Sequence, residues 1–591
     1  MKVPGIVLKT GNFLKPDRVQ NRSADIKFGD WLEASLSTRL QADQAIYKTP
    51  GGINVLFDGY LSDVNGVNVL DDFWNQPAQT IAELYRDHRD TFLSSLRGSF
   101  TCLIYDEPKD EALLFSDRRA SRPLFYARDD QGSILAAPEI RDIVSVLQTE
   151  PKLNIGAAAE FLSSSIGISF SDHTLFQGIS KFPQAGCLLI RKTYSEIRRY
   201  WNLHFSATEH CADEDFYIEK LDALLRQSLR RLLRIANAPF LFLSGGIDSR
   251  LVLAYLLSEH KCAIPIVTYK MSAGEGDDHT IARIIAEQCK LGIEEFEVCY
   301  HELFESIEHN VFLLDGRVDL FDTPSSFQIC QRLSNKYRIY FDGQTGFDWK
   351  TNVKSIKEAL VQVGLFRLNQ VSRLRHWLNP KVRKDLCNHL NAVLSTLVKD
   401  TDETEPTNVE GKLFYEQRLG NMNNGHDVAM LRWLECAKPL ADEDIVEFSA
   451  TVPLIMRENK YLEYKALERI YPLLLRVPLS HKPVQGVALV FKSVLKEDTA
   501  LSTYIRQELC DTLDPRLKEL LDISRFTYDV DAILQDKPLS VVSGDWAMRV
   551  PGAWRFAFLR SENRIHPVYL MLKILQLNIY LKGLKVADLR A

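Results

Sequence analysis

The sequence predicts a multidomain α/β protein in which an amino-terminal α+β domain precedes a parallel-sheet domain with a helical carboxy-terminal part. Three observations support this. The 591-residue chain is 46% hydrophobic, so it can bury two or more cores. Roughly the first 150 residues alternate short β-rich runs with turns, and a charged helical pattern follows Trp201. A strand–helix–strand order comes next, so we place the domains at 1–204 and 205–591.

The amino-terminal domain carries its clearest β-rich runs at 53–61, 98–107 and 112–119. Turn-forming residues separate these runs. This arrangement is typical of a mostly antiparallel sheet that buries one face. Cys102 lies inside the second run and is expected to be a small core residue.

The second domain opens at 213–236, where apolar residues recur at three and four positions and arginines occupy the opposite face of a predicted helix. A buried-strand run at Pro239–Leu243 leads through glycines into a helix, and a further strand run follows at 264–269. This βαβ order predicts a parallel sheet. From about residue 355 onward the pattern is mostly helical.

Composition excludes several classes of function. Lys and Arg total 72 against 78 Asp and Glu, a net charge of −6, so no global attraction to nucleic acid or to an anionic membrane is expected. The ten cysteines include no C-x-x-C pair, which speaks against zinc ribbons and thioredoxin chemistry. The first residues lack the apolar run of a signal peptide, so a cytoplasmic location is expected. The apolar stretch 569–584 contains Lys573, Asn578 and Lys582, and it predicts a partly buried helix that does not span a membrane.

Basic residues concentrate between Lys350 and Arg375, where six Lys and Arg accompany the single acid Glu358. Such a run is typical of a solvated loop followed by a helix. It also suits a lid or a docking surface for an extended acidic partner, and the sequence leaves both interpretations open.

The strongest chemical signal is FLFLSGGIDSRLVLAYLL at 240–257. A strand ends at Ser244-Gly245-Gly246, and Asp248-Ser249 open a helix. Glycines let backbone amides approach an anion, and the helix amino terminus adds partial positive charge, so the loop suits a phosphate. An acid at this place is favourable when it holds Mg²⁺ that bridges phosphates, so Asp248 is a candidate metal ligand. A Walker motif would need Gly-Lys-Ser/Thr, which is absent, and a purely structural turn is the alternative.

The loop SGGIDS resembles the pyrophosphate loop of ATP pyrophosphatases, and its flanks resemble class B, glutamine-hydrolysing asparagine synthetases. Further motifs similar to that family occur in order at 57–61, 96–106, 116–126, 175–186, 435–448, around Lys465 and around Lys482. The resemblance implies an amino-terminal sandwich of the Ntn-hydrolase kind and an ATP-pyrophosphatase domain.

The resemblance also assigns roles. It implies ATP and Mg²⁺ as cofactors, with Asp248 and Asp348 as metal ligands and Lys482 neutralising charge on the phosphates and the tetrahedral intermediate. Glu435 would orient or deprotonate the amine, or else form a buried salt bridge with Lys438 or another base. The full set comprises Ser244, Gly245, Gly246, Asp248, Ser249 and Gly343 for nucleotide binding, and Lys482, Glu435 and Gln344 for catalysis.

Two departures from the family pattern shape the functional hypothesis. Working glutaminases of the family present an amino-terminal cysteine, whereas this sequence reads Met1-Lys2-Val3-Pro4, so domain 1–204 is predicted to lack glutaminase activity. In the stretch 340–351, Gly343 and Gln344 align with the family, but the acid Asp348 comes one residue late. Either the loop bulges to bring Asp348 in, or a second carboxylate comes from elsewhere.

Family chemistry begins when a substrate carboxylate attacks the α-phosphate of ATP, and an amine then displaces AMP from the acyl-adenylate. A member without glutaminase activity takes its amine from its own substrate or from free ammonia. The sequence most resembles lasso peptide cyclases, which join a peptide's amino-terminal amine to an Asp or Glu side chain. This implies a precursor peptide, a leader-removing protease and a recognition element as partners. A small-molecule amide or β-lactam synthetase, an ammonia-dependent asparagine synthetase and a catalytically silent scaffold are the alternatives.

Overall fold

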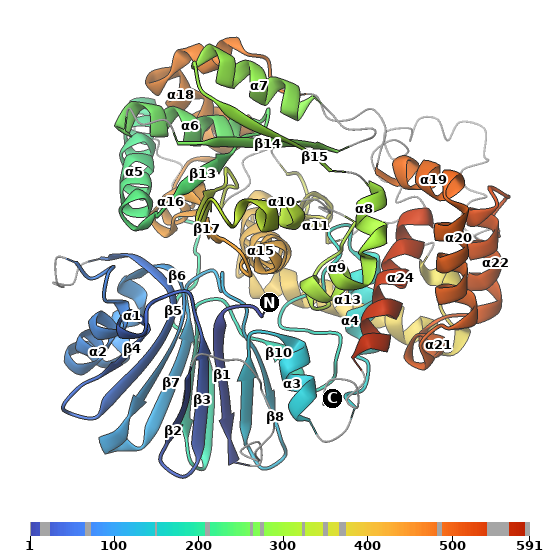
Figure 1. Ribbon diagram of the computed structural model, residues 1–591, viewed down its shortest axis with the longest axis horizontal. Helices are drawn as coiled ribbons and strands as arrows, with labels where there is room; N and C mark the ends of the chain where they lie inside the picture. The colour runs from blue at the N-terminus through green and yellow to red at the C-terminus, as the bar shows by residue number, and fades with distance from the viewer. Residues whose placement is uncertain are drawn as a thin grey trace.

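A computed structural model describes most of the chain (Figure 1). The described residues are 2–11, 24–65, 72–147, 150–206, 213–260, 264–271, 277–298, 300–321, 326–346, 353–365, 374–480, 487–540 and 567–584.

The amino-terminal part is a sandwich of two six-stranded antiparallel sheets (Figure 1). One sheet has the order β10-β8-β9-β1-β3-β2 and the other β12-β11-β7-β6-β5-β4. The strands are β1 Gly5–Thr10, β2 Ala24–Phe28, β3 Leu32–Ser37, β4 Ile46–Lys48, β5 Ile53–Val64, β6 Leu96–Asp106, β7 Glu111–Ser116, β8 Phe125–Arg128, β9 Ile134–Ala137, β10 Ile179–Lys181, β11 Gly186–Arg191 and β12 Tyr194–Arg199. The predicted antiparallel α+β domain is confirmed.

Strand β6 shows how the sandwich differs from the half-buried sheet that the sequence pattern predicts. All eleven of its residues are buried. Leu103 faces the other sheet, whereas Phe100 and Cys102 pack under helix α2 (Pro77–His88). Because α2 covers the second face, the strand has no solvent side. Burial raises the pKa of the Cys102 thiol well above its usual value, which confirms the predicted core role of this residue.

The second sheet is wholly parallel, as predicted, with the order β15-β14-β13-β16-β17. Its strands are β13 Pro239–Phe242, β14 Ile266–Met271, β15 Ile293–Val298, β16 Ile339–Phe341 and β17 Glu435–Ala437. Helices α5 (Glu214–Ile235), α6 (Ile247–His260) and α18 (Tyr461–Ile470) pack together on one face around Leu251 and Leu462. Strand β13 lies in the middle, between β14 and β16.

The rest of the described chain is mainly helical, again as predicted, and packs beside both sheet regions (Figure 1). Its longer helices are α13 Pro380–Asp400, α19 Val487–Glu497, α20 Thr499–Arg506, α22 Ile523–Leu534 and α24 Pro567–Gly583. Helix α4 (Ile155–Ser163), from the amino-terminal half, packs against α13 and α24. One core cluster therefore joins residues from Val7 to Leu584.

Helix α24 corrects the expectation of a partly buried helix at 569–584. It is buried from Val568 to Leu581, and its polar residues are partnered inside the protein. The Lys573 ammonium donates to the Ser164 carbonyl at 2.8 Å. The Gln576 amide nitrogen donates to the Val318 carbonyl at 2.7 Å. These bonds explain why polar residues occur in an apolar run. None of the helices in the described ranges has the length and hydropathy that crossing a membrane requires.

The basic segment at 350–375 is described in part. Lys354 and Arg375 are exposed, and Lys357 is exposed on helix α11 (Ile356–Val363). This agrees with a solvated face. Lys350, Arg367 and Arg373 lie outside the described residues.

Candidate active site

The glycine loop Ser244–Gly246 joins β13 to α6 at the centre of the parallel sheet. The strand order reverses there, because β14 flanks β13 on one side and β16 on the other. In open parallel sheets the crevice at the carboxyl ends of strands beside such a switch point is where ligands bind. The sequence folds this way because four apolar residues fill the strand and two glycines permit the sharp turn.

The loop is held by its own serines and by one carboxylate. The amide of Ser244 donates to Ser249 Oγ at 3.1 Å, and the amide of Gly246 donates to Ser244 Oγ at 3.2 Å. The amide of Gly245 donates to Asp278 Oδ1 at 2.9 Å. Asp278 begins helix α7 (Asp278–Gln288). A carboxylate oxygen thus accepts a hydrogen bond from the amide that the sequence analysis expects to bind a phosphate. The loop therefore has an anion-binding geometry.

Gly245 cannot be replaced without a clash. An added Cβ would lie 2.4 Å from Ser480 Cβ and 3.0 Å from Asp278 Oδ1. Gly343 has the same constraint, because its Cβ would lie 2.5 Å from the amide nitrogen of Ser249. The end of β16 therefore rests directly on the start of α6, which brings Gly343 to the glycine loop as the sequence predicts.

Arg250 is a residue that the sequence analysis missed. Its side chain is 1% exposed, and it binds four backbone carbonyls. One terminal nitrogen donates to Leu474 at 3.0 Å and Val477 at 2.6 Å, and the other donates to Gly245 at 2.8 Å and Pro478 at 2.7 Å. Arg250 thereby ties the segment 474–480 to the glycine loop. Its signal in the sequence is a charged residue among the apolar residues of the helix that follows the glycine loop.

The segment held by Arg250 ends beside the loop, where the amide of Ser480 donates to the Gly245 carbonyl at 3.2 Å. The catalytic candidate Lys482 follows two positions later and lies outside the described residues.

Asp248, the predicted metal ligand, forms an ion pair with Lys460. Lys460 has a left-handed backbone, with φ of 58°, and directly precedes α18. Sequence analysis singled out the neighbouring Lys465 instead. Lys465 pairs with Glu468 at 3.1 Å on the exposed face of α18. The cation beside Asp248 is therefore Lys460.

A second carboxylate, Asp342, lies at the carboxyl end of β16. Burial raises the pKa of Asp342, and the nearby carboxylates of Asp427 and Asp248 raise it further, against the lowering effect of the Lys438 ammonium. The amide of Gln344 donates to Asp342 Oδ1 at 3.2 Å. Two carboxylates close enough to repel each other beside the glycine loop form a site that attracts a cation. The other metal candidate, Asp348, lies outside the described residues.

Gln344, a predicted catalytic residue, has an identified partner: its Oε1 accepts a hydrogen bond from Lys438 Nζ at 2.6 Å. Lys438 is buried and also pairs with Asp427. Asp342, Asp427 and Cys436 place one potential ligand atom each within 4.8 Å of one another. Gln344 thus lies beside an acidic group at the end of strands β16 and β17.

Glu435 is positioned differently from the other candidates. It pairs with Arg122 at 2.5 Å and with Arg39 at 2.6 Å, both from the sandwich, and it does not pair with Lys438. Burial alone would raise its pKa, but the two guanidinium groups lower the pKa of Glu435 to about 2. A carboxylate with so low a pKa is a weak base at neutral pH. In this structure Glu435 joins strand β17 to the sandwich.

The acidic residues after Glu435 also face the sandwich and α5. Arg97 donates to Asp444 Oδ1 at 2.9 Å, and Arg231 donates to Asp444 Oδ2 at 2.7 Å. Arg118 pairs with Glu447. The motif at 435–448 is therefore an ion-paired contact between the two domains.

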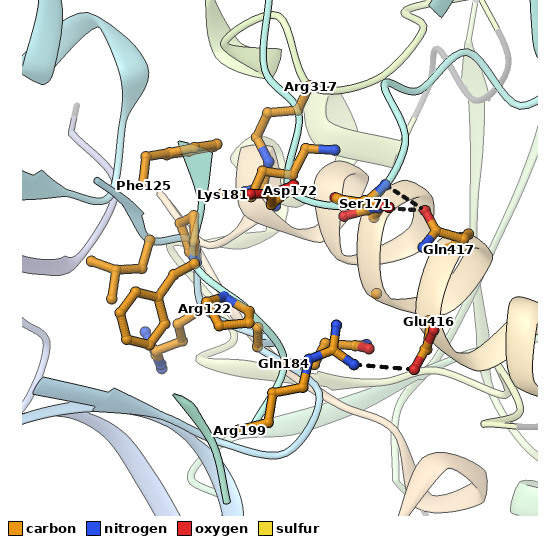
Figure 2. Close-up of a pocket in the computed structure, with 17 residues that line it drawn as sticks. Arg122, Phe125, Ser171, Asp172, Lys181, Gln184, Arg199, Arg317, Glu416 and Gln417 are labelled. Atoms are coloured by element: carbon orange, nitrogen blue, oxygen red, sulfur yellow. Dashed lines mark hydrogen bonds and ion pairs between the residues drawn. The ribbon is translucent and has the colours of Figure 1, made fainter. Parts of the chain in front are cut away.

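A cavity of about 60 Å³ lies between the sandwich and residues 416–421 (Figure 2). Arg317 is 8% exposed, and one of its terminal nitrogens has no hydrogen-bond partner. Burial and the charge of Arg317 lower the pKa of Lys181, across the same cavity, to about 7. No residue of the glycine loop lines this cavity, so it is separate from the nucleotide site.

Comparison with known proteins adds independent observations. Residues 75–201 match a family model described as "Glutamine amidotransferase domain", and residues 220–346 match one described as "Asparagine synthase". The chain is 24% identical over 486 residues to "Asparagine synthetase [glutamine-hydrolyzing] 3" of Bacillus subtilis, covering 74% of this chain and 76% of the relative. It is 25% identical over 218 residues to "Amidase chry2" of Gibberella zeae, covering 35% of this chain and 31% of that protein.

Among solved structures, the glutamine phosphoribosylpyrophosphate amidotransferase from B. subtilis, complexed with ADP and GMP, has 13% identity and a TM-score of 0.21. That comparison covers 50% of this chain and 60% of the other.

The amidotransferase match precedes the asparagine synthase match along this chain, and the second one contains the glycine loop whose amide binds a carboxylate oxygen. The chain thus resembles the class B asparagine synthetase superfamily, and its asparagine synthase match indicates that it is an ATP-dependent amide ligase.

Proposed function

We propose that this ligase closes the macrolactam ring of a lasso peptide precursor, joining the amino-terminal amine of the peptide to an Asp or Glu side chain. The single observation that supports a substrate-borne amine is the lack of a reactive thiol in the sandwich. The first 204 residues contain two cysteines, Cys102 and Cys187. Both are buried in strands, and burial raises the pKa of each thiol, that of Cys187 to about 12. Neither forms the thiolate that glutamine hydrolysis needs.

Polar contacts join the sandwich to strand β17. Arg122 and Asp58 are each 1% exposed and pair at 2.8 Å, and Arg122 also holds Glu435. The Tyr60 hydroxyl donates to the Cys436 carbonyl at 3.1 Å. Ion pairs and hydrogen bonds therefore form the contact between residues 57–61 of strand β5, with Arg122, and strand β17.

In the proposed reaction the glycine loop holds the pyrophosphate end of ATP. The amides of Gly245 and Gly246 and the hydroxyls of Ser244 and Ser249 supply the donors. A phosphate would displace Asp278 from the Gly245 amide, because the single amide proton already forms a 2.9 Å hydrogen bond to Asp278 Oδ1. Arg250 keeps the loop and segment 474–480 in register while the substrate carboxylate approaches the α-phosphate.

Mg²⁺ fits the acidic side of this site. Asp248 and Asp342 would hold it, since burial and mutual repulsion raise the pKa of Asp342, and a divalent cation removes that penalty. When bound, the ion neutralises charge on the phosphates. Lys460, now paired with Asp248, would then be released toward the nucleotide. Among the described residues, we propose Asp342 as the second carboxylate that the late position of Asp348 leaves open.

The proposal is tested by isotope exchange between pyrophosphate and ATP. We expect exchange that depends on Mg²⁺ and on a linear precursor peptide with a free amino terminus, and a product that has lost one water. Asp248→Ala should abolish exchange, whereas Asp511→Asn, on an exposed part of the helical region, should not. Glutamate release from glutamine, or activity on aspartate with ammonia alone, would contradict the lasso assignment.

Two further arms separate the remaining alternatives. Exchange driven by amino-acid derivatives but not by peptides would indicate a small-molecule amide or β-lactam synthetase. ATP binding without exchange, under every carboxylate supplied, would indicate a silent scaffold. The proposed partners, a leader-removing protease and a leader-recognition element, are tested by whether they raise the rate with full-length precursor but not with the pre-cut core peptide.

A further inference from the structure

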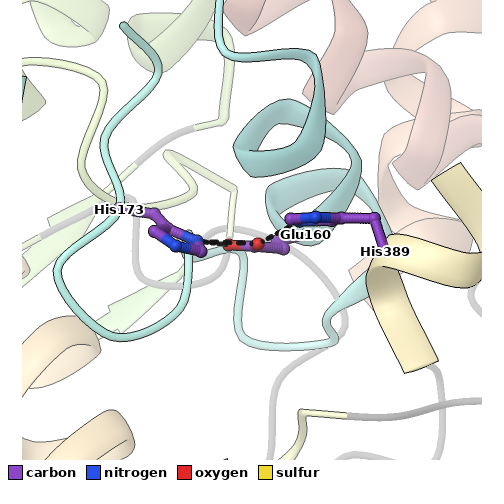
Figure 3. Close-up of side chains that lie close together, drawn as sticks. All are labelled: Glu160, His173 and His389. Carbon is purple, nitrogen blue, oxygen red and sulfur yellow. Dashed lines mark hydrogen bonds and ion pairs between the residues drawn. The ribbon is translucent and has the colours of Figure 1, made fainter. Parts of the chain in front are cut away.

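Two histidines and one glutamate lie close together outside the glycine loop (Figure 3). Glu160 lies on α4, His173 on the loop before β10, and His389 on α13. We call these three residues the Glu160 cluster. It joins segments that are 229 residues apart in the sequence.

Both imidazoles point at one carboxylate oxygen (Figure 3). Glu160 Oε1 lies 2.9 Å from His173 Nδ1 and 2.6 Å from His389 Nε2. The ligand atoms of all three residues lie within 4.8 Å of one another. The other oxygen, Oε2, accepts a hydrogen bond from the Phe170 amide at 2.7 Å. The carboxylate is thus fixed in orientation before any ligand arrives.

We propose that the Glu160 cluster binds a divalent transition-metal ion, with Zn²⁺ as the best match to its donors. Two imidazole nitrogens and one carboxylate oxygen form a known three-ligand set for zinc, and they leave one coordination position open. Imidazole ligands also favour zinc, copper, nickel and iron over Mg²⁺ and Ca²⁺, which prefer oxygen. The chemistry of this cluster therefore differs from that of the Asp248 and Asp342 site.

The separations suit an ion at the centre of the cluster. Ligands at about 2.1 Å from a tetrahedral zinc lie roughly 3.4 Å from one another. The observed contacts of 2.6 Å and 2.9 Å are shorter than that value, so small side-chain rotations would separate the ligand atoms enough to admit the ion. Gly156 gives room for them, because a Cβ there would lie 2.7 Å from His389 Nε2.

Accessibility and charge agree with a bound cation. The Glu160 side chain is fully buried, whereas the two imidazole side chains are 33% and 34% exposed, so an ion can enter from solvent. Asp172 adds negative charge near His173, and the Lys181 ammonium is the nearby positive group. Because the pKa of Lys181 is about 7, its electrostatic repulsion of a metal ion is reduced at neutral pH and above.

A metal here would strengthen the contact between two parts of the molecule that already meet through packing and through the Glu160–His389 contact. Helix α4 follows the sandwich in sequence, and α13 belongs to the helical part. Because the ion binds the folded arrangement and no preformed site exists in the unfolded chain, its binding free energy adds to stability.

The test uses the full-length protein, freed of metal by chelator and dialysis, with Zn²⁺ and Co²⁺ as probes. We expect one equivalent of Zn²⁺ by calorimetry, a visible Co²⁺ spectrum with nitrogen ligation, and a higher melting temperature with Zn²⁺. His173→Ala and His389→Ala should each weaken binding by more than about 100-fold, beyond the cost of losing an outer hydrogen bond. Both sites are half-buried, so these variants are safer than a change at the fully buried Glu160.

Two matched controls make the result specific. His301→Ala removes an exposed histidine that faces Asp498 at 3.7 Å, and it should leave Zn²⁺ binding unchanged. Cys436→Ser removes the sulfur of the Asp342, Asp427 and Cys436 group. Zn²⁺ that survives both histidine variants but is lost in Cys436→Ser would overturn the proposal. So would a protein that retains no Zn²⁺ and whose melting temperature does not respond to it.

Discussion

At the scale of single residues, three carboxylates with different partners surround the glycine loop. Asp248 pairs with Lys460, Asp278 accepts from the Gly245 amide, and Asp342 faces other acids. The cation near Asp342 is Lys438, which also contacts Asp427 and Gln344. The three carboxylates should therefore respond differently to substitution, and two predictions separate them.

Asp342→Asn should slow Mg²⁺-dependent pyrophosphate exchange by at least about 100-fold, equivalent to about 3 kcal/mol of activation free energy. The neutral side-chain amide of the variant would bind Mg²⁺ more weakly than the carboxylate does. The Mg²⁺ concentration for half-maximal exchange should therefore rise as well. The measurement is exchange rate against Mg²⁺ concentration, with Asp511→Asn as the matched exposed control. An unchanged Mg²⁺ dependence would remove Asp342 from the metal site.

Asp278→Ala should tighten pyrophosphate binding severalfold, because it frees the Gly245 amide for a phosphate oxygen. Asp278→Asn keeps an acceptor at the same place and should change the affinity less. Titration calorimetry with pyrophosphate measures both variants. Weaker binding by the alanine variant would mean that Asp278 supports the ligand and does not compete with it.

At the scale of elements, what the sequence could predict depended on whether the signal was local. Strands β5, β6, β13 and β14 and the turn at Ser244–Gly246 follow from residues adjacent in the chain, and the structure confirms them. Asp342 reaches the loop only because β16 pairs in parallel with β13, with Leu241 opposite Phe341. The function of Arg250 depends on carbonyls more than 220 residues away. No local pattern carries such information.

The misjudged burial of β6 and α24 has the same origin. A strand that is covered on both faces and a helix with partnered polar residues both depend on what packs against them. In α24, the polar residues Lys573 and Gln576 are typical of a solvent-facing surface. They are buried because carbonyls of residues 161–164 and 318 accept their hydrogen bonds. The local sequence therefore predicts correctly that these segments form a strand and a helix. Their degree of burial depends on partners distant in the sequence.

Arg250→Lys should lower the free energy of unfolding by about 2–4 kcal/mol and raise the KM for ATP, because an ammonium cannot reach four carbonyls at once. Denaturant unfolding and initial rates measure the two effects. Arg469→Lys, on the exposed side of α18, is the matched control. If the variant matches the wild type in both measurements, segment 474–480 is held by other contacts.

At the scale of the whole molecule, charged side chains connect the sandwich to strand β17 and the residues that follow it. Arg122, Arg97 and Arg118 reach from the sandwich to Glu435, Asp444 and Glu447. The pKa of Glu435 falls from 4.5 to about 2 in the folded protein. Its stabilising effect is therefore complete above about pH 4.5 and is lost as the pH falls toward 2.

Glu435→Gln should reduce the free energy of unfolding by about 3 kcal/mol at neutral pH, from the size of the pKa change. The difference from wild type should shrink between pH 4.5 and pH 2, because the wild-type carboxylate itself becomes protonated there. Denaturant unfolding at several pH values measures this. Glu468→Gln, an exposed glutamate paired with Lys465, should show no such convergence. A constant difference across this range would show that the carboxylate charge is not responsible.

The position of α24 has a consequence for how the protein is made. Its side chains bond to residues near 161–164, 318–320 and 508–514, which lie in widely separated parts of the chain. During translation all of these segments leave the ribosome before α24 does. Until α24 emerges, their carbonyls and amides lack the hydrogen-bond partners that its side chains provide in the folded protein. We expect the nascent chain to need protection from aggregation during that interval, and the centre of the helical region to close only after synthesis has passed residue 583.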